Sequence, residues 1–161
     1  MKRLFWIALA GVLAVSAPSL GKPEKDAERR LQGVWRLAAY KSSLKSSQPW
    51  VGLMFLERGY FSRMYQQENR KKLSFNYERE TDLTPAQKDL LIESFREFRA
   101  GIGTYRIAGN TIVMKSMAIY NPNALGSEFT REFRFVDDKL ILTGTTKVAG
   151  DQVEEMWTPA D

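Results

Sequence analysis

From residue 34 onwards, short apolar-rich segments alternate with turn signals, which is the pattern of antiparallel strands joined by hairpins. The clearest turn is Gly109 followed by Asn110, a pair of residues typical of tight β-hairpins. The predicted strands cover residues 34–41, 51–56, 60–67, 73–77, 104–108, 111–120, 129–136, 140–147 and 153–158. Eight or nine strands linked mainly by tight turns favour a mainly β, antiparallel up-and-down barrel, because closure removes the exposed edges of a sheet.

One helix interrupts this pattern, over residues 84–100. Thr84 and Gln87 form a capping-box sequence, and Pro85 suits the first helical position. The apolar positions that share one helical face are Leu91, Phe95 and Phe98. Gly101 is expected to end the helix. Two roles are open for this helix: it plugs or covers one end of the sheet, or it forms a mobile lid over a cavity.

Hairpin register can be predicted because side chains alternate between the two faces of a strand. Turns at residues 109–110 and 137–138 each bring the apolar positions of their flanking strands onto one face. The expected pairs are Phe135 with Leu140, Phe133 with Leu142, Ile107 with Ile112, and Tyr105 with Met114. The expected inner face then includes Tyr105, Ile107, Ile112, Met114, Ala118, Tyr120, Phe129, Phe133 and Phe135. These residue types suit an adaptable cavity and a solid core equally well.

A polar row is expected to cross this apolar face. The predicted register sets Leu142 opposite Trp157 and Gly144 opposite both Arg131 and Glu155 on its two neighbours. Arg131 and Glu155 then lie two strand spacings apart, roughly 10 Å, with no side chain between them. Three arrangements are open: an internal Arg–Glu pair, Arg131 packed on a tryptophan at the barrel floor, or a cation that binds an anionic ligand head group. Burial of an unpaired charge is costly, so we expect one of these arrangements to hold.

The first 21 residues have a different character. Lys2 and Arg3 precede an uninterrupted apolar run over residues 4–15, and small residues with Pro18 follow. This is the three-part pattern of a secretory signal peptide, and the run is shorter than the roughly 20 residues that span a bilayer. We expect cleavage after Gly21, a periplasmic or secreted mature protein, and no stable membrane insertion after cleavage.

Composition narrows the chemistry that is available. Hydrophobic residues make up 43% of the 161 residues and charged residues 27%, which fits one globular domain. The absence of cysteine excludes disulfides, thiolate metal sites and a thiol nucleophile, and the absence of histidine excludes Ser-His-Asp catalysis and histidine metal sites. Without Lys2 and Arg3, 22 basic residues face 19 acidic ones. This mild positive charge and the expected export argue against a nucleic-acid partner, and we expect no metal or cofactor.

Several short motifs resemble those of the lipocalin-like family. Gly33 and Trp35 match the opening G-x-W strand, and the bacterial lipocalin-like domain carries four further motifs: G-x-Y, N-P-N-x-x-G, R-x-F and L-x-L. In this chain they correspond to residues 103–105, 121–126, 131–133 and 140–142, and Trp157 fits the closing strand. The resemblance covers most of residues 30–158 and implies an up-and-down β-barrel that binds small hydrophobic molecules in its interior. Typical lipocalins instead carry their long helix after the eighth strand and often contain disulfides.

We therefore predict a signal peptide over residues 1–21 and one lipocalin-like barrel over residues 22–161. The leading hypothesis is non-catalytic binding or carriage of a small hydrophobic or amphiphilic molecule inside the barrel. The candidate ligand-binding residues are Arg131, Tyr105, Tyr120, Met114, Phe133 and Glu155, and the candidate structural residues are Gly33, Trp35, Gly144 and Trp157. Two alternatives stay open: an isomerase or cyclase with Glu155 or Tyr105 as proton carrier, and an envelope interaction module with a filled barrel.

Overall fold

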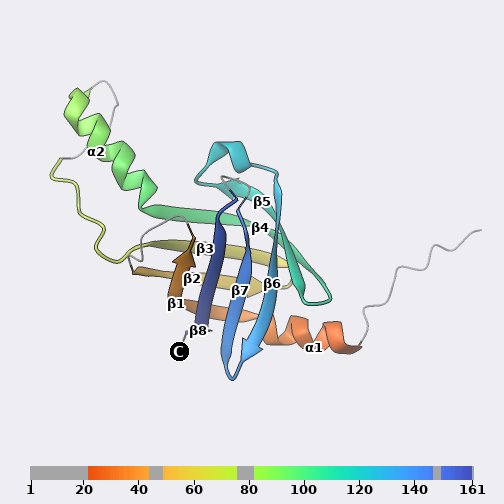
Figure 1. Cartoon of the computed structure of the whole chain (residues 1–161). Helices are drawn as coiled ribbons and strands as arrows, with labels where there is room; N and C mark the ends of the chain where they lie inside the picture. Colours follow the sequence, from red (N-terminus) through yellow and green to blue (C-terminus); the bar gives the residue numbers. More distant parts are fainter. Residues whose placement is uncertain (1–21, 44–48, 76–81, 147–149, 161) are drawn as a thin grey trace, which may run out of the picture.

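The chain folds into a closed barrel of eight antiparallel strands (Figure 1). The computed structural model describes residues 22–43, 49–75, 82–146 and 150–160. Its strands are β1 (Gly33–Ser42), β2 (Trp50–Glu57), β3 (Tyr60–Gln67), β4 (Phe98–Ala108), β5 (Thr111–Ile119), β6 (Glu128–Val136), β7 (Lys139–Thr145) and β8 (Gln152–Pro159). Its helices are α1 (Lys22–Leu31), α2 (Pro85–Arg96) and the short 3-10 helix η2 (Pro122–Ala124). Each strand pairs with the next in sequence, and β8 pairs with β1, so the predicted up-and-down barrel is confirmed.

The barrel has eight strands and not nine within the described part of the chain. Residues 73–75, the described half of the expected strand at 73–77, form no strand, and residues 76–77 lie outside the described ranges. The expected signal peptide at residues 1–21 also lies outside them. None of the described helices is long and apolar enough to cross a membrane.

Two of the three predicted hairpin registers are confirmed. Strands β6 and β7 pair Phe133 with Leu142, and β4 and β5 pair Tyr105 with Met114. The third register is wrong by two residues, because β8 pairs Glu155 with Leu142 and not with Gly144. The loop between β7 and β8 closes one residue earlier than expected, where the backbone N–H of Thr146 donates to the carbonyl of Asp151. A two-residue shift preserves the face, so Glu155 still points inward.

A β-bulge in strand β5 overturns one inner-face prediction. The pairing with β5 shifts between Ile102 and Gly103, where Ser116 pairs with Gly103 but Ala118 pairs with Ile102. The extra residue, Met117, reverses the alternation of side chains beyond it. Ala118 is consequently exposed, and its expected place on the inner face is wrong.

The first helix closes one end of the barrel. Leu31, the last residue of α1, is fully buried in the core, and its carbonyl accepts a hydrogen bond of 2.8 Å from the indole N–H of Trp35. The guanidinium carbon of Arg30 lies 3.9 Å from the centre of the Phe135 ring. The barrel therefore has a closed end at α1 and leaves the opposite end available for a cavity.

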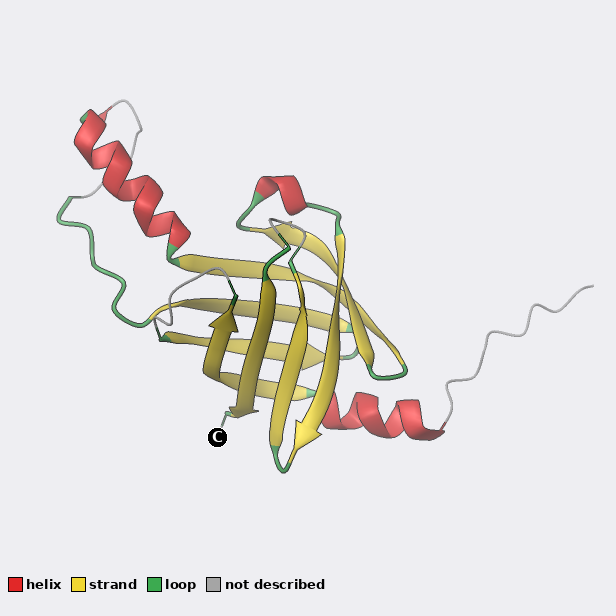
Figure 2. Cartoon of the chain, viewed as in Figure 1, coloured by secondary structure: helices red, strands yellow, loops and turns green. Residues whose placement is uncertain are grey.

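The second helix does not cover the barrel, although its predicted start is confirmed. The Thr84 hydroxyl accepts from the Gln87 N–H, and the Gln87 side chain accepts from the Thr84 N–H. The helix ends at Arg96, and Gly101 lies inside β4, because the chain from Phe98 onwards pairs with β3. Figure 2 shows α2 projecting from the barrel. The expected plug or lid over the barrel end is therefore wrong in this structure.

A substitution at Leu140 tests whether the confirmed strand register determines which residues form the core. It is fully buried between Phe135 and Trp157 on the neighbouring strands. We expect Leu140→Ala to lower the free energy of unfolding by about 2–5 kcal/mol, because it leaves a cavity in the core. The control Leu125→Ala removes a leucine that is 60% exposed and should cost less than about 0.5 kcal/mol. Urea denaturation measures both, and equal losses would contradict the assignment of Leu140 to the core.

Candidate ligand-binding cavity

A cavity of about 260 Å³ occupies the end of the barrel opposite α1. Its lining comes from strands β1, β3, β4, β5, β6, β7 and β8 and from the segment around η2. The aromatic residues of the lining are Tyr40, Phe61, Tyr65, Tyr120 and Phe129. Its charged residues are Arg63, Arg99, Glu128, Arg131 and Glu155. The barrel interior is therefore hollow at this end, and both rings and charges face the hollow.

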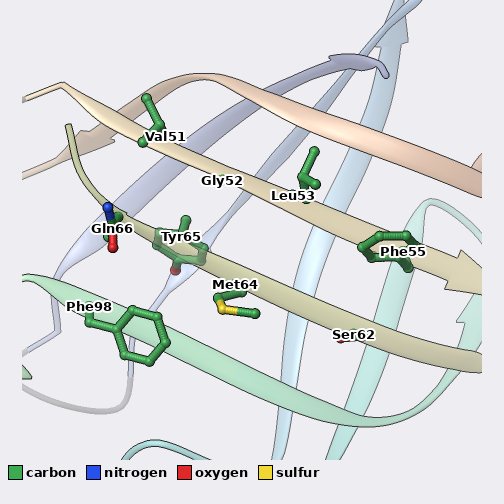
Figure 3. A pocket seen from close by; sticks show the side chains of 9 residues that line it. All are labelled: Val51, Gly52, Leu53, Phe55, Ser62, Met64, Tyr65, Gln66 and Phe98. Atoms are coloured by element: carbon green, nitrogen blue, oxygen red, sulfur yellow. The ribbon is translucent and has the colours of Figure 1, made fainter. Parts of the chain in front are cut away.

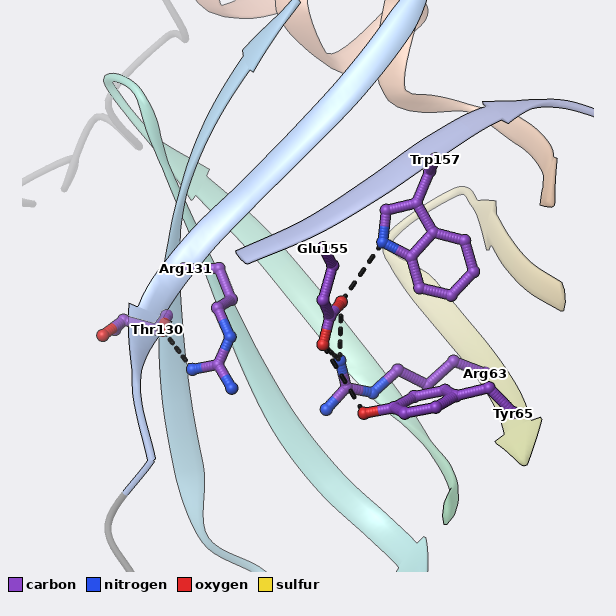
Figure 4. Close-up of polar contacts among 6 residues, drawn as sticks. All are labelled: Arg63, Tyr65, Thr130, Arg131, Glu155 and Trp157. Atoms are coloured by element: carbon purple, nitrogen blue, oxygen red, sulfur yellow. Dashed lines mark hydrogen bonds and ion pairs between the residues drawn. The ribbon is translucent and has the colours of Figure 1, made fainter. Parts of the chain in front are cut away.

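Glu155 is the anionic centre of this interior. Its side chain is 1% exposed, and the carboxylate accepts hydrogen bonds from three side chains (Figure 4). The Arg63 guanidinium donates at 3.3 and 3.4 Å, the Tyr65 hydroxyl at 3.5 Å, and the Trp157 indole N–H at 3.2 Å. A buried carboxylate needs this number of donors to compensate for lost water. The partner of Glu155 is thus Arg63, and the expected pairing with Arg131 is wrong.

Arg131 reaches into the same interior from β6 without a carboxylate partner among the residues that the structure describes. The residue is 5% exposed, and its Nη1 donates to the carbonyl of the adjacent Thr130 at 2.9 Å. Its Nε has no hydrogen-bond partner among the described residues. The ring beneath its guanidinium is Phe129, at 5.7 Å, and not a tryptophan. Of the three arrangements open from the sequence, only the free cation agrees with these contacts.

The absence of a side chain at Gly144 creates the space that Arg131 occupies. A Cβ at this position would lie 2.9 Å from the Arg131 Cδ and 3.1 Å from its Nη1. Both distances are shorter than ordinary van der Waals contact, so a larger residue would displace the guanidinium. The expected structural role of Gly144 therefore consists of making room for a charged side chain.

The charges of the interior do not balance. Three guanidinium groups of the described lining, on Arg63, Arg99 and Arg131, accompany two carboxylates, on Glu128 and Glu155. Burial lowers the pKa of Arg131, and the positive charge of Arg63 acts in the same direction, whereas Glu155 opposes both. Burial also disfavours the Arg63 cation, but Tyr65 and Glu155 raise its pKa above the ordinary value. The cavity is consequently a positively charged environment lined with rings.

A comparison with protein families shows the family to which this chain belongs. The family model of the lipocalin-like domain matches residues 32–158, which is most of the chain. The chain belongs to the lipocalin-like domain family. The match covers all eight strands of the barrel almost completely, so the resemblance of the short motifs extends to the whole fold.

Three solved structures are similar to this lipocalin-like protein at low sequence identity. A lipocalin-like protein from Bacteroides uniformis is 13% identical, with 81% of this chain and 99% of that chain covered at a TM-score of 0.44. An uncharacterized protein from Bacteroides eggerthii is 12% identical, with 78% and 97% covered at 0.41. The REP1-NXSQ fatty acid transporter is 15% identical, with 83% and 98% covered at 0.38. A search of curated proteins finds no significant match.

The structure brings together half of the residues that the sequence proposes for ligand contact. Arg131, Tyr120 and Glu155 line the cavity of this lipocalin-like protein. The other three, Tyr105, Met114 and Phe133, are buried in the core and are not part of the lining. The structural candidates Trp35 and Trp157 are buried in the same core. Gly33 joins α1 to β1 with a φ of +135°, a conformation that glycine adopts most readily.

The lining residues that sequence reasoning missed include Arg63, Arg99 and Tyr40. A signal for Arg63 was present, because it shares the period-two face of β3 with the buried Phe61 and Tyr65. Arg99 had no such signal. Its guanidinium carbon lies 4.9 Å from the Tyr120 ring and 5.5 Å from the Trp50 ring, two contacts that depend on the folded barrel.

The Glu155 carboxylate should be essential for stability because it compensates buried cations. We expect Glu155→Gln to lower the free energy of unfolding by about 3–5 kcal/mol, the cost of leaving a buried charge unpaired. The control is Glu154→Gln on the same strand, whose carboxylate pairs with Lys41 and Arg134 at the surface. That change should cost less than about 1 kcal/mol. Similar urea midpoints for the two variants would contradict the role assigned to Glu155.

Alkaline pH should destabilise the protein through its interior tyrosines. Burial, followed by the negative charges of Glu155 and Asp151, raises the pKa of Tyr40 from 10.0 to about 12, and burial also raises that of Tyr65. The unfolded chain therefore loses these protons first, so stability is present below pH 10 and is lost as the pH rises towards 12.

Thermal unfolding across this pH range measures the effect. Tyr40→Phe should make the fall in melting temperature shallower, because the residue no longer titrates. Tyr60→Phe, which removes a hydroxyl from a side chain that is 61% exposed, is the control and should leave the slope unchanged. A slope that is the same in both variants would exclude Tyr40 as a contributor.

Proposed function

We propose that this lipocalin-like protein binds a small anionic amphiphile in its barrel interior, without catalysis, in the periplasm or outside the cell. The observation that carries the proposal is Arg131, a buried guanidinium that borders the cavity and whose Nε lacks a partner among the described residues. An anionic oxygen at this position would accept charge-assisted hydrogen bonds and neutralise the excess cation. The negative charge of the ligand would thus balance the excess positive charge of the cavity.

The dimensions and lining of the cavity favour a compact ligand. A volume of about 260 Å³ corresponds to roughly nine groups the size of a water molecule, at the lower end of small-molecule sites. Rings from Phe61, Tyr65 and Phe129 offer apolar contact beside the cation. We therefore expect a short-chain or aromatic anion to fit better than a long extended chain.

Two features favour binding over the alternative functions. The carboxylate of Glu155 already accepts hydrogen bonds from three side chains, which suits a role in holding Arg63 more than proton transfer. The other candidate proton carrier, Tyr105, is not part of the cavity lining. The existence of the cavity itself favours a ligand-binding protein over an interaction module with a filled barrel.

A matched pair of fluorescent probes tests the proposal. 8-Anilinonaphthalene-1-sulfonate is anionic, whereas N-phenyl-1-naphthylamine has the same ring system without the sulfonate. We expect tighter binding of the anionic probe and expect Arg131→Met to weaken it roughly 10- to 100-fold, because hydrogen bonds to charged groups contribute about 1.5–3 kcal/mol. Binding of the neutral probe should change little.

Arg134→Met provides the control on the same strand. The Arg134 side chain is 56% exposed and lies on the outer face, so its loss should leave both affinities unchanged. Arg131→Met should remain folded, because it replaces a buried cation that pairs with no carboxylate in the described part of the chain. An unchanged preference for the anionic probe in Arg131→Met would refute the proposal.

A further inference from the structure

The outer face of strands β2 to β5 carries an unusual concentration of exposed apolar side chains. We define the outer sheet patch as Leu53, Phe55, Tyr60, Met64, Ile102 and Met117, which are 39–61% exposed. Their alternation with the fully buried Met54 and Leu56 places them on the outside of the barrel. Cross-strand pairing connects them, because Leu53 is opposite Met64. Contiguous apolar surface of this kind marks a contact site.

Two hollows indent the outer sheet patch. One, of about 310 Å³, lies among Leu53, Met64 and Phe98 (Figure 3), and a second of similar volume lies among Tyr60, Ile102 and Met117. Phe55 and the short side chain of Ser62 border both hollows. A surface with paired hollows accepts inserted side chains, which favours a structured protein partner.

The projecting helix α2 carries the complementary feature. Ile92 and Phe95 are 53% and 52% exposed, and their spacing of three residues places them on one side of the helix. Ser94 is the only buried residue of this 12-residue helix. Helices of this length are marginal in water without tertiary packing. The exposed side of α2 therefore lacks the contacts that normally stabilise a short helix.

We infer that the protein forms a two-fold symmetric dimer in which α2 of each copy packs on the outer sheet patch of the other. Ile92 and Phe95 insert into the two hollows. The exchange is reciprocal, so one symmetric arrangement covers both unpartnered apolar surfaces of both copies. The helix is also continuous with the patch, because the chain passes from Arg96 to Phe98, which borders the first hollow.

The area of the two apolar surfaces supports a second copy as the partner. Eight large apolar side chains per copy, each about half exposed, give on the order of 1,200 Å² of buried surface over two copies. This area reaches the lower limit of specific, stable protein interfaces.

Light scattering coupled to gel filtration tests the dimer. We expect the purified protein to have twice the mass of one chain, and expect the double change Ile92→Glu with Phe95→Glu, or the single change Met64→Glu, to give monomers. Val136→Glu is the control, since Val136 is 46% exposed and lies outside the patch and α2. It should remain dimeric. Circular dichroism establishes that every variant keeps its strands, and a monomeric parent protein at all concentrations would overturn the inference.

Disulfide trapping tests the arrangement, since the chain has no cysteine of its own. Mixing Ile92→Cys chains with Leu53→Cys chains should give a covalent dimer of the two, whereas Ile92→Cys mixed with Val136→Cys should not. A double Ile92→Cys, Leu53→Cys chain that closes a disulfide within itself would show α2 on its own barrel and would overturn the exchange. Binding of a monomeric protein to phosphatidylglycerol vesicles through the same residues would reassign the patch to lipid and also overturn it.

Discussion

The pairing of β1 with β8 is the constraint on which the rest of the structure depends. These strands come from opposite ends of the described chain, and their hydrogen bonds turn an open sheet into a barrel. Closure gives every strand an inside and an outside, so alternation along the chain becomes a division between core and surface. It also brings Glu155 on β8 within hydrogen-bond distance of Arg63 on β3, across the interior. The cavity, the ion pair and the outer patch all follow from this division.

Within the barrel, glycine positions allow large polar side chains to be accommodated. Gly144 leaves space for Arg131, and at Gly52 a Cβ would come within 2.3 Å of the Tyr65 Cβ on the paired strand. Tyr65 in turn donates to Glu155. The interior polar cluster therefore depends on two residues without side chains as much as on its charged members. Cations exceed carboxylates in this cluster, which supports the proposal of an anionic ligand.

The barrel has charged side chains in its interior and large apolar side chains on part of its outer face, which is partly the reverse of the usual distribution. Charges lie inside, around Arg131 and Glu155, while Phe55 and Met64 are exposed on the outer face. The first feature supports recognition of an anionic ligand, and the second supports association with another chain. The two surfaces are close in the chain, since Arg99 at the cavity follows Phe98 at the edge of the outer patch. Packing of α2 would thus hold the strand that carries Arg99.

The sequence by itself determined the features that depend on neighbouring residues. The hairpins at 109–110 and 137–138, the capping box at Thr84 and the inward orientation of Arg131 all follow from local spacing and alternation. An up-and-down barrel of eight or nine strands was also predicted, because each hairpin joins strands adjacent in the chain, and the described residues form eight.

Only the tertiary structure decided the features that depend on distant residues. Arg63 and Glu155 are 92 positions apart, so their pairing has no local signal and arises from barrel closure. The bulge in β5 opposite Ile102 and Gly103 reverses a face, and the pairing of Phe98 with β3 ends α2 early and directs it away from the barrel. In each case a hydrogen bond or ion pair to another strand outweighed the local preference, because backbone and charged groups inside a barrel must find partners.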